Sequence, residues 1–261
     1  MGFLGEIKSV WEHICTHYKP GQIEIAGVII AQIIGFVLPA AAYLLIDVLF
    51  PEFSAKHKIQ SMRRQPTTAQ IWHCIKISMF NQIWVVMFHA VAVYLTGLEH
   101  SLLIMDSRLP SLKTVAVDFL FGLVAREISF YYVHRALHHP SIYAYIHKMH
   151  HKYTAPISFA AEYAHPVEHI FANILPIALP LTLKGTHFLS LMAFTVFELW
   201  EAAADHSGYD FLKLPPAEIH DLHHEKFRVN YSTLGIMDWI HGTHVVGWDR
   251  PQRKAAEQKK D

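Results

Sequence analysis

Histidines crowd two short stretches of this sequence at spacings that suit metal binding. HRALHHPSIYAYIHKMHH occupies residues 134–151, and HDLHH occupies residues 220–224. On a helix, side chains three or four positions apart share a face. Three sets have this spacing: His134 and His138; His147, His150 and His151; and His220, His223 and His224. Imidazoles packed so densely would repel one another when protonated, and metal ions would hold them neutral. The repeated HxxHH pattern therefore predicts a metal site rather than a pH-sensing or solvated histidine patch.

The number of histidines in these sets predicts two metal ions, because a tetrahedral zinc site uses four ligands. Imidazole suits zinc, copper, iron or nickel, so the ligand type alone leaves the metal open. The chain has no HExxH motif of zinc proteases, and it has one Glu-x-x-His pair, Glu162 with His165, where a carboxylate di-iron bundle uses two. Long apolar segments adjoin the histidines. Iron that activates dioxygen against an apolar C–H bond fits this setting best, since zinc is redox-inert.

Four long apolar runs predict that the histidines are positioned by a membrane bundle. Apolar residues make up 52% of the chain, and its mean hydropathy is +0.21. Residues 23–50 and 81–98 are long and apolar enough to cross a bilayer. Residues 114–133 are interrupted by three charges, and residues 170–204 are divided by LKG, which leaves a re-entrant hairpin or two crossings open. Pro140 predicts a break between two short helices. The predicted fold is an all-α membrane bundle with a histidine-rich helical cap.

Basic residues are distributed unevenly, although the formal net charge is zero with histidine neutral. A neutral chain gives no reason to expect nucleic-acid binding. One basic group lies between the first two apolar runs, in residues 51–70, and the positive-inside rule places it in the cytosol with the basic C-terminus. Counting crossings from there brings both histidine stretches to the cytosolic side. We expect membrane helices at 1–113, a catalytic domain at 114–245 and a polar, basic tail at 246–261.

The histidine sets and the phrases between them resemble a known family. HRALH, HKMHH and HDLHH, with TAPISFAAEYAHPVEH, DHSGYD and MDWIHGT, are similar to the sterol desaturase and fatty acid hydroxylase superfamily. The resemblance covers about residues 115–245 and is closest to C-4 methylsterol monooxygenases and fatty-acid-hydroxylase-domain proteins. It implies an integral membrane protein of the endoplasmic reticulum whose cytosolic cap holds two non-haem irons. It also implies dioxygen, a sterol methyl group or fatty acyl chain as substrate, and electrons from NAD(P)H through cytochrome b5.

The resemblance also implies roles for residues outside the three boxes. It adds His165 and His206 to the eight box histidines as metal ligands. Four further residues are expected to surround and orient the ligands: His139, His169, Asp205 and Asp238. No flavin, nicotinamide or covalent haem motif occurs, so electrons must come from a partner. The sequence thus predicts a membrane di-iron monooxygenase, in which zinc can replace iron during purification. The alternatives are an inactive structural subunit that keeps the fold and a membrane zinc hydrolase.

Overall fold

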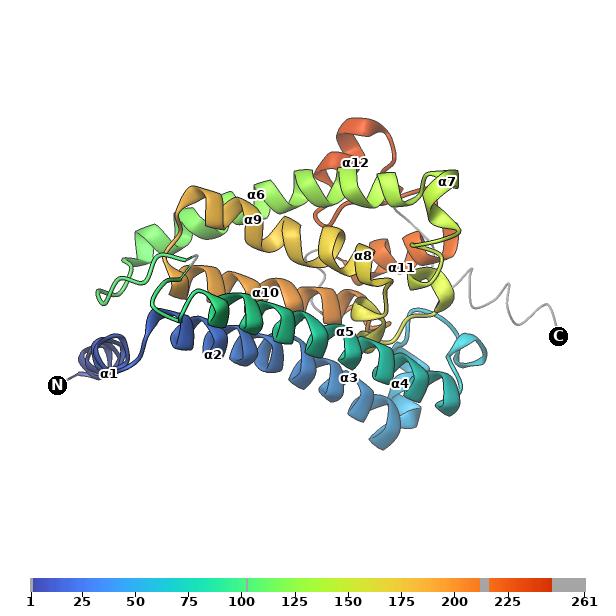
Figure 1. Ribbon diagram of the computed structural model, residues 1–261. Coiled ribbons are helices and arrows are strands. Elements are labelled where there is room, and N and C mark those ends of the chain that lie inside the picture. Colours follow the sequence, from blue (N-terminus) through green and yellow to red (C-terminus); the bar gives the residue numbers. More distant parts are fainter. Residues whose placement is uncertain (1, 102, 212–215, 246–261) are drawn as a thin grey trace.

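The computed structural model describes residues 2–101, 103–211 and 216–245, and this part of the chain is built from helices (Figure 1). The longer helices are α1 (Phe3–His17), α2 (Pro20–Gln32), α3 (Leu38–Leu49), α5 (Thr68–Leu95), α6 (Leu112–Leu137), α9 (Leu175–Lys184), α10 (Phe188–Asp205) and α11 (Ala217–Lys226). The shorter ones are α4 (Pro51–His57), α7 (Pro140–Tyr143), α8 (Pro166–Glu168) and α12 (Ile236–His241). Narrow 3₁₀ turns occupy Met62–Arg64, His150–Lys152 and Ser158–Glu162, and wide π-helical turns occupy Ile33–Val37 and His169–Ile174. The predicted all-α architecture is confirmed, and the predicted tail at 246–261 lies outside the described residues.

Proline accounts for both π-helical turns. It has no N–H, and its ring clashes with the carbonyl four residues earlier, so a helix that passes through proline must widen or bend. Pro39 follows the turn at Ile33–Val37, and Pro176 follows the turn at His169–Ile174. The two apolar stretches that contain these prolines therefore remain helical across them.

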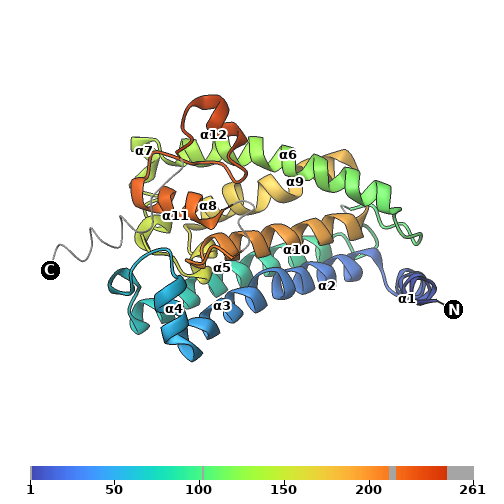
Figure 2. The ribbon, with the colours of Figure 1, turned by 180° about the vertical axis from the view of Figure 1, so that it is seen from behind.

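Helix α10 forms the centre of the bundle. It contacts α2, α3, α6, α9 and α11, and both views show it between the layer of α6 and α9 and the layer of α2 and α3 (Figures 1 and 2). A Cβ atom on Gly35 would lie 2.9 Å from the Val196 backbone, and one on Gly122 would lie 2.7 Å from the Phe194 ring. These glycines let the helices approach closely. Because His206 directly follows α10, this packing fixes its position.

Three helical stretches are long and apolar enough to cross a membrane: Pro20–Leu49, Thr68–Leu95 and Pro166–Lys184. The first two contain most of the spans predicted at 23–50 and 81–98. The third leads into a hairpin, in which α9 ends at Gly185, with a left-handed φ of 75°, and α10 returns beside it. The chain is an integral membrane protein.

Helix α6 contains the apolar run 114–133 but is not among these three stretches. The charged residues within the run 114–133 point inward: Asp118, Arg126 and Glu127 are 1%, 7% and 2% exposed. The opposite face is apolar and open, with Leu120 65% exposed. Charges turned toward the bundle and apolar side chains turned outward are the arrangement expected of a helix that faces lipid. The crossing of α6 stays a prediction, and this orientation supports it.

The histidine-bearing segments gather at one end of the bundle. Figure 1 shows α7 and α11 at the end that also carries α4, with α1 at the opposite end. The basic loop between the first two spans reaches α11. Gln60 Nε2 donates to Asp221 Oδ1 over 2.8 Å, and Arg64 Nη1 lies 3.1 Å from Glu225 Oε1. These contacts, with the clustering of both histidine stretches, place the basic loop and the histidines at the same end of the bundle.

Candidate metal centre

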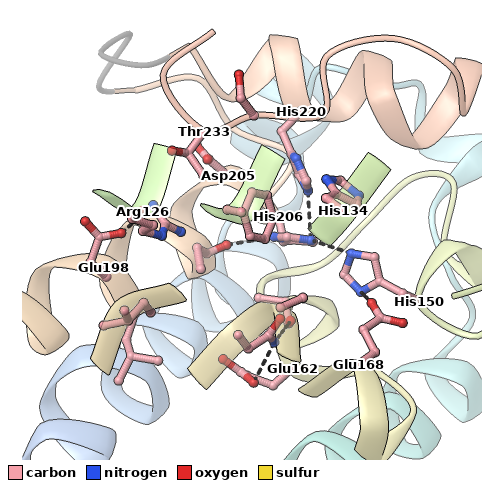
Figure 3. A pocket seen from close by; sticks show the side chains of 18 of the residues that line it. Arg126, His134, His150, Glu162, Glu168, Glu198, Asp205, His206, His220 and Thr233 are labelled. Carbon is pink, nitrogen blue, oxygen red and sulfur yellow. Dashed lines mark hydrogen bonds and ion pairs between the residues drawn. The ribbon is translucent and has the colours of Figure 1, made fainter. Parts of the chain in front are cut away.

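Nine histidine side chains form two clusters inside the cap. The five-histidine cluster contains His134, His138, His147, His151 and His223, and the four-histidine cluster contains His150, His206, His220 and His224. Within each cluster, the candidate ligand nitrogens all lie within 4.8 Å of one another. Figure 3 shows the rings of His150 and His220 converging on His206. All eight box histidines are thus brought together with His206.

Each HxxHH box supplies both clusters. In HKMHH, His147 and His151 join the five-histidine cluster, whereas His150 joins the four-histidine cluster. In HDLHH, the two residues four apart join the four-histidine cluster, and His223 joins the other. Residues four apart therefore stay together in one cluster, while the third member of each box points to the second centre. Both boxes tie the two clusters to each other.

The two boxes differ in backbone structure. HDLHH lies on α11, as predicted, and α7 begins at Pro140 after a break that the sequence also predicted. The predicted α-helix through HKMHH is wrong, because turns follow Tyr143 and a 3₁₀ turn covers His150–Lys152. Tertiary packing overrides the local pattern here. Tyr153, directly after the box, is buried in the core, and its hydroxyl donates to the Gln70 carbonyl over 2.9 Å.

The nitrogens that face one another in each cluster are Nε2 atoms. In the five-histidine cluster, Nε2 of His147 lies 2.9 Å from Nε2 of His138. In the four-histidine cluster, Nε2 of His206 lies 2.9 Å from that of His220 and 3.3 Å from that of His224. Nitrogens bound to one metal at about 2.1 Å lie about 3.0 to 3.4 Å apart in octahedral or tetrahedral geometry. The donor set and its spacing fit one metal ion in each cluster.

The other ring nitrogen, Nδ1, is often anchored by the protein. Nδ1 of His134 donates to the Tyr231 carbonyl over 2.7 Å, and Nδ1 of His206 donates to the Ala202 carbonyl over 2.8 Å. His223 Nδ1 likewise donates to a backbone carbonyl over 2.7 Å. A carbonyl only accepts, so these rings carry their proton on Nδ1 and present the Nε2 lone pair to the cluster.

Burial keeps the clustered imidazoles neutral. It lowers the pKa of His134 and that of His206 to about 4, and it lowers the pKa of His138 to about 2 with help from the charge of His134. Burial, followed by neighbouring imidazoles, also lowers the pKa of His220 and that of His224 well below the usual range. At neutral pH, converging lone pairs with no proton between them repel one another, and a cation relieves that repulsion.

A small pocket of about 60 Å³ joins the two clusters. It is lined by His134 and His147 of the five-histidine cluster and by His150, His206 and His220 of the four-histidine cluster (Figure 3). A water molecule occupies about 30 Å³ of liquid, so the pocket has room for a diatomic or triatomic molecule. The arrangement can therefore hold two metals beside one small reactant.

Buried charges border the pocket on the α10 side. Arg126 of α6 forms ion pairs with Glu198 and Glu201 of α10. Arg126, Glu198 and Asp205 line the pocket with the histidines (Figure 3). A buried charge needs such partners because removing an isolated charge from water is costly. One charge that interrupts the run 114–133 thus belongs to the wall of the pocket.

Sequence comparisons place this centre in a known family. Residues 119–243 match the model of the fatty acid hydroxylase family. The very-long-chain aldehyde decarbonylase GL1-8 of Oryza sativa subsp. indica is 31% identical over 97% of this chain and 96% of its own length. The chain belongs to the fatty acid hydroxylase family. Membership confirms the resemblance found in the histidine boxes, and the two buried histidine clusters are typical of the family's di-iron centres.

Other relatives of this fatty acid hydroxylase family member have different named activities. Fatty acid hydroxylase ahd1 of Mycosarcoma maydis is 36% identical over 74% of this chain, which spans 50% of that longer protein. Methylsterol monooxygenase 2-2 of Arabidopsis thaliana is 30% identical over 91% of each chain. No solved structure matches the chain significantly. These names cover different reactions, so the family fixes the type of metal site rather than one substrate.

A glutamate that the sequence analysis missed touches both clusters of this family member. Glu168 Oε1 lies 2.8 Å from Nδ1 of His147 and 3.9 Å from Nδ1 of His150, and the residue is 2% exposed. A carboxylate at Nδ1 orients a ring so that Nε2 faces the metal. The available signal was its place in the phrase AHPVEH, three residues after His165.

The two aspartates expected to orient imidazoles lie in different places. Asp238 accepts hydrogen bonds from the backbone N–H of Tyr231 over 2.8 Å and of Ser232 over 2.7 Å. It therefore holds the loop whose Tyr231 carbonyl anchors His134, and it reaches the cluster through that backbone. Asp205 lines the pocket beside His206 (Figure 3).

His169 contacts a carboxylate of the pocket wall. Its Nδ1 lies 2.8 Å from Glu162 Oε2, and Asn173 Nδ2 donates to the same oxygen over 3.0 Å. Glu162 lines the pocket (Figure 3). His169 is thus separated from the clustered rings by a carboxylate that it helps to position.

The structure does not bring His165 or His139 into either cluster. Nδ1 of His165 accepts from the backbone N–H of Val167 over 3.2 Å, and Nδ1 of His139 accepts from that of Ser141 over 3.4 Å. Each ring satisfies a free N–H at the start of a short helix, α8 or α7. This capping holds both rings at the helix starts, away from the facing Nε2 atoms.

Proposed function

We propose that this protein is a membrane non-haem di-iron monooxygenase that oxidises a C–H bond of a lipid. One observation carries the proposal: both HxxHH boxes divide between two all-imidazole clusters that share a small pocket. The nine clustered histidines are the proposed ligands. Two irons held there would supply dioxygen-dependent oxidation of a C–H bond, which redox-inert zinc would not.

The chain's own residues orient the ligands and limit access. The backbone carbonyls at Tyr231 and Ala202 hold His134 and His206 with Nε2 turned inward, and Glu168 contacts one ring of each cluster. The pocket admits a small molecule and little water. In the proposed overall reaction, one atom of dioxygen enters the lipid as a hydroxyl group. The other leaves as water, with two electrons and two protons from outside.

The lipid would reach the pocket from the membrane half of the molecule. An apolar cavity of about 360 Å³ lies among α2, α5, α9 and α10. It shares Glu162, Asn173, Ile177 and Leu199 with the pocket at the histidines. Its volume is in the range of small-molecule sites, about 300 to 1,000 Å³. The proposed substrates are a sterol with a C-4 methyl group and a fatty acyl chain, in agreement with the names of relatives.

The proposed setting is the endoplasmic reticulum membrane, with the histidine cap in the cytosol. The basic loop that contacts α11 supports this orientation through the positive-inside rule. An electron donor such as cytochrome b5, reduced by an NAD(P)H reductase, would then meet the cap from the cytosol.

Metal analysis and turnover test this function together. The full chain, loaded with Fe²⁺ in lipid nanodiscs, is expected to bind about two irons. With NADH, a cytochrome b5 reductase, cytochrome b5 and ¹⁸O₂, it should convert a 4-methylsterol or a fatty acyl lipid to a product that contains ¹⁸O. Reactions without lipid or without cytochrome b5 are the controls.

Two results would contradict the proposal. Reproducible binding of one iron or none after loading would refute the two-metal reading. Two bound irons without lipid-dependent oxygen consumption would instead favour a structural subunit that keeps the fold. Zinc found in the protein as purified contradicts neither the two-metal site nor the oxidase function, because the loading step exchanges zinc for iron.

A further inference from the structure

The apolar cavity contains polar groups, and most of them are already partnered. Glu24 Oε1 lies 3.0 Å from His89 Nε2, and the Ser101 hydroxyl donates to the other oxygen of Glu24. Glu162 is held by His169 and Asn173 at the end near the metal clusters. Both carboxylates that line the cavity, those of Glu24 and Glu162, therefore have polar partners.

Two amides in the cavity wall are different. Among the described residues, Gln82 Nε2 and Gln32 Oε1 are buried atoms with no hydrogen-bond partner. Both side chains line the apolar cavity, and Gln82 is 4% exposed. Buried polar groups are nearly always hydrogen-bonded, because an unmet donor or acceptor loses its bonds to water without replacement. The pair therefore points to a ligand that supplies the missing partners.

The two amides lie at the same level of neighbouring helices. Gly21 at the start of α2 donates to the Leu98 carbonyl just past the end of α5, so the two helices run in opposite directions. Glu24 of α2 pairs with His89 of α5. Gln32 follows Glu24 by eight positions, and Gln82 precedes His89 by seven. At about 1.5 Å per residue, these steps are about 12 and about 10.5 Å, so the two amides lie at about the same height along the helices.

The charge of the cavity wall narrows the chemical class of the ligand. None of the described residues that line the cavity is lysine or arginine. A fatty acid carboxylate would therefore be buried beside two acidic residues without lysine or arginine as a partner, at a large cost. A hydroxyl group, in contrast, donates one hydrogen bond and accepts another. It matches one free acceptor and one free donor.

We propose, as an extension of the function proposed above, that the cavity binds a neutral lipid through a hydroxyl group held between Gln32 and Gln82. The hydroxyl donates to Gln32 Oε1 and accepts from Gln82 Nε2. The apolar body of the lipid fills the rest of the cavity and extends to Ile177 and Leu199, which also line the pocket at the histidines. Free fatty acids are excluded from the class.

Matched lipids test this assignment without turnover. Binding of tritiated cholesterol and of 1-octadecanol to the iron-loaded full chain in nanodiscs is compared with binding of their methyl ethers and of stearate. The ethers keep the apolar body but cannot donate a hydrogen bond. At least one alcohol is expected to bind roughly tenfold or more tightly than its ether, and stearate is expected to bind weakly.

Variants then test whether Gln32 and Gln82 cause the preference for the alcohol over its ether. Gln82→Leu and Gln32→Leu should bring the alcohol down to the affinity of its ether, and both should keep two irons and an unchanged melting temperature. Gln22→Leu, the same change at an exposed site on α2, should keep the full preference. Equal binding of alcohol and ether, no binding of either pair, or a preference that survives Gln82→Leu would overturn the inference. If the unmodified chain prefers the alcohol to its ether but oxidises no lipid, only the proposed oxidase function is contradicted.

Discussion

The two histidine clusters are built from the same boxes but differ in size and access. The five-histidine cluster takes His134 from α6 and His138 from directly after it, while the four-histidine cluster takes His206 from directly after α10. Three of the four members of the smaller cluster line the shared pocket, compared with two of the five in the larger one. A metal with fewer protein ligands keeps a position open for a reactant. We therefore expect the four-histidine cluster to be the more reactive and the more easily emptied centre.

Removal of a ligand from the smaller cluster should give the largest effect. His206→Ala leaves three imidazoles there and leaves the five-histidine cluster intact. The iron content should fall from about two to about one per chain, and turnover should be lost, because both metals are required. Iron analysis and product formation are measured at equal folded yield. His165→Ala is the matched control and should keep both irons, since that ring caps α8. Two irons in the His206 variant would refute the assignment.

Glu168 should affect both clusters at once, with an intermediate loss. Its carboxylate contacts His147 of the larger cluster and His150 of the smaller one. Glu168→Gln keeps the shape but weakens the contact that orients His147 and removes the charge beside His150, and the expected cost is about 10- to 100-fold in metal affinity or activity. Competition with a chelator gives the affinity of each iron. A loss confined to one iron would show that the glutamate serves a single cluster.

His169 should give the smallest effect of the three. It positions Glu162 and is therefore one step further from the clustered rings. His169→Ala should leave both irons bound and lower turnover by less than about tenfold, below the range for direct partners of ligands. Iron content and the rate of product formation are measured beside those of Glu168→Gln. Loss of an iron in this variant would place His169 among the residues that hold the metals.

Parts of the site could be read from the sequence because they depend on local spacing. The residue types and spacing predicted that the eight box histidines form a metal site, and the resemblance to the family added His206. Arg126 illustrates the limit. In the sequence it interrupts an apolar run, whereas in the structure it is buried against Glu198 and Glu201 of α10. A hydropathy pattern cannot show that a charge meets a partner 70 or more residues away.

The sequence by itself determined the kind of molecule: a helical membrane protein with a dense set of neutral imidazole ligands. Apolar run length and helical periodicity are local properties, so they can be read without knowledge of the fold. Only the tertiary structure decided how the boxes divide between two centres and that Glu168 lies beside both. Both depend on the packing of α6, α8, α10, α11 and the turns around HKMHH about one interior. Side chains distant in sequence become neighbours only through that packing.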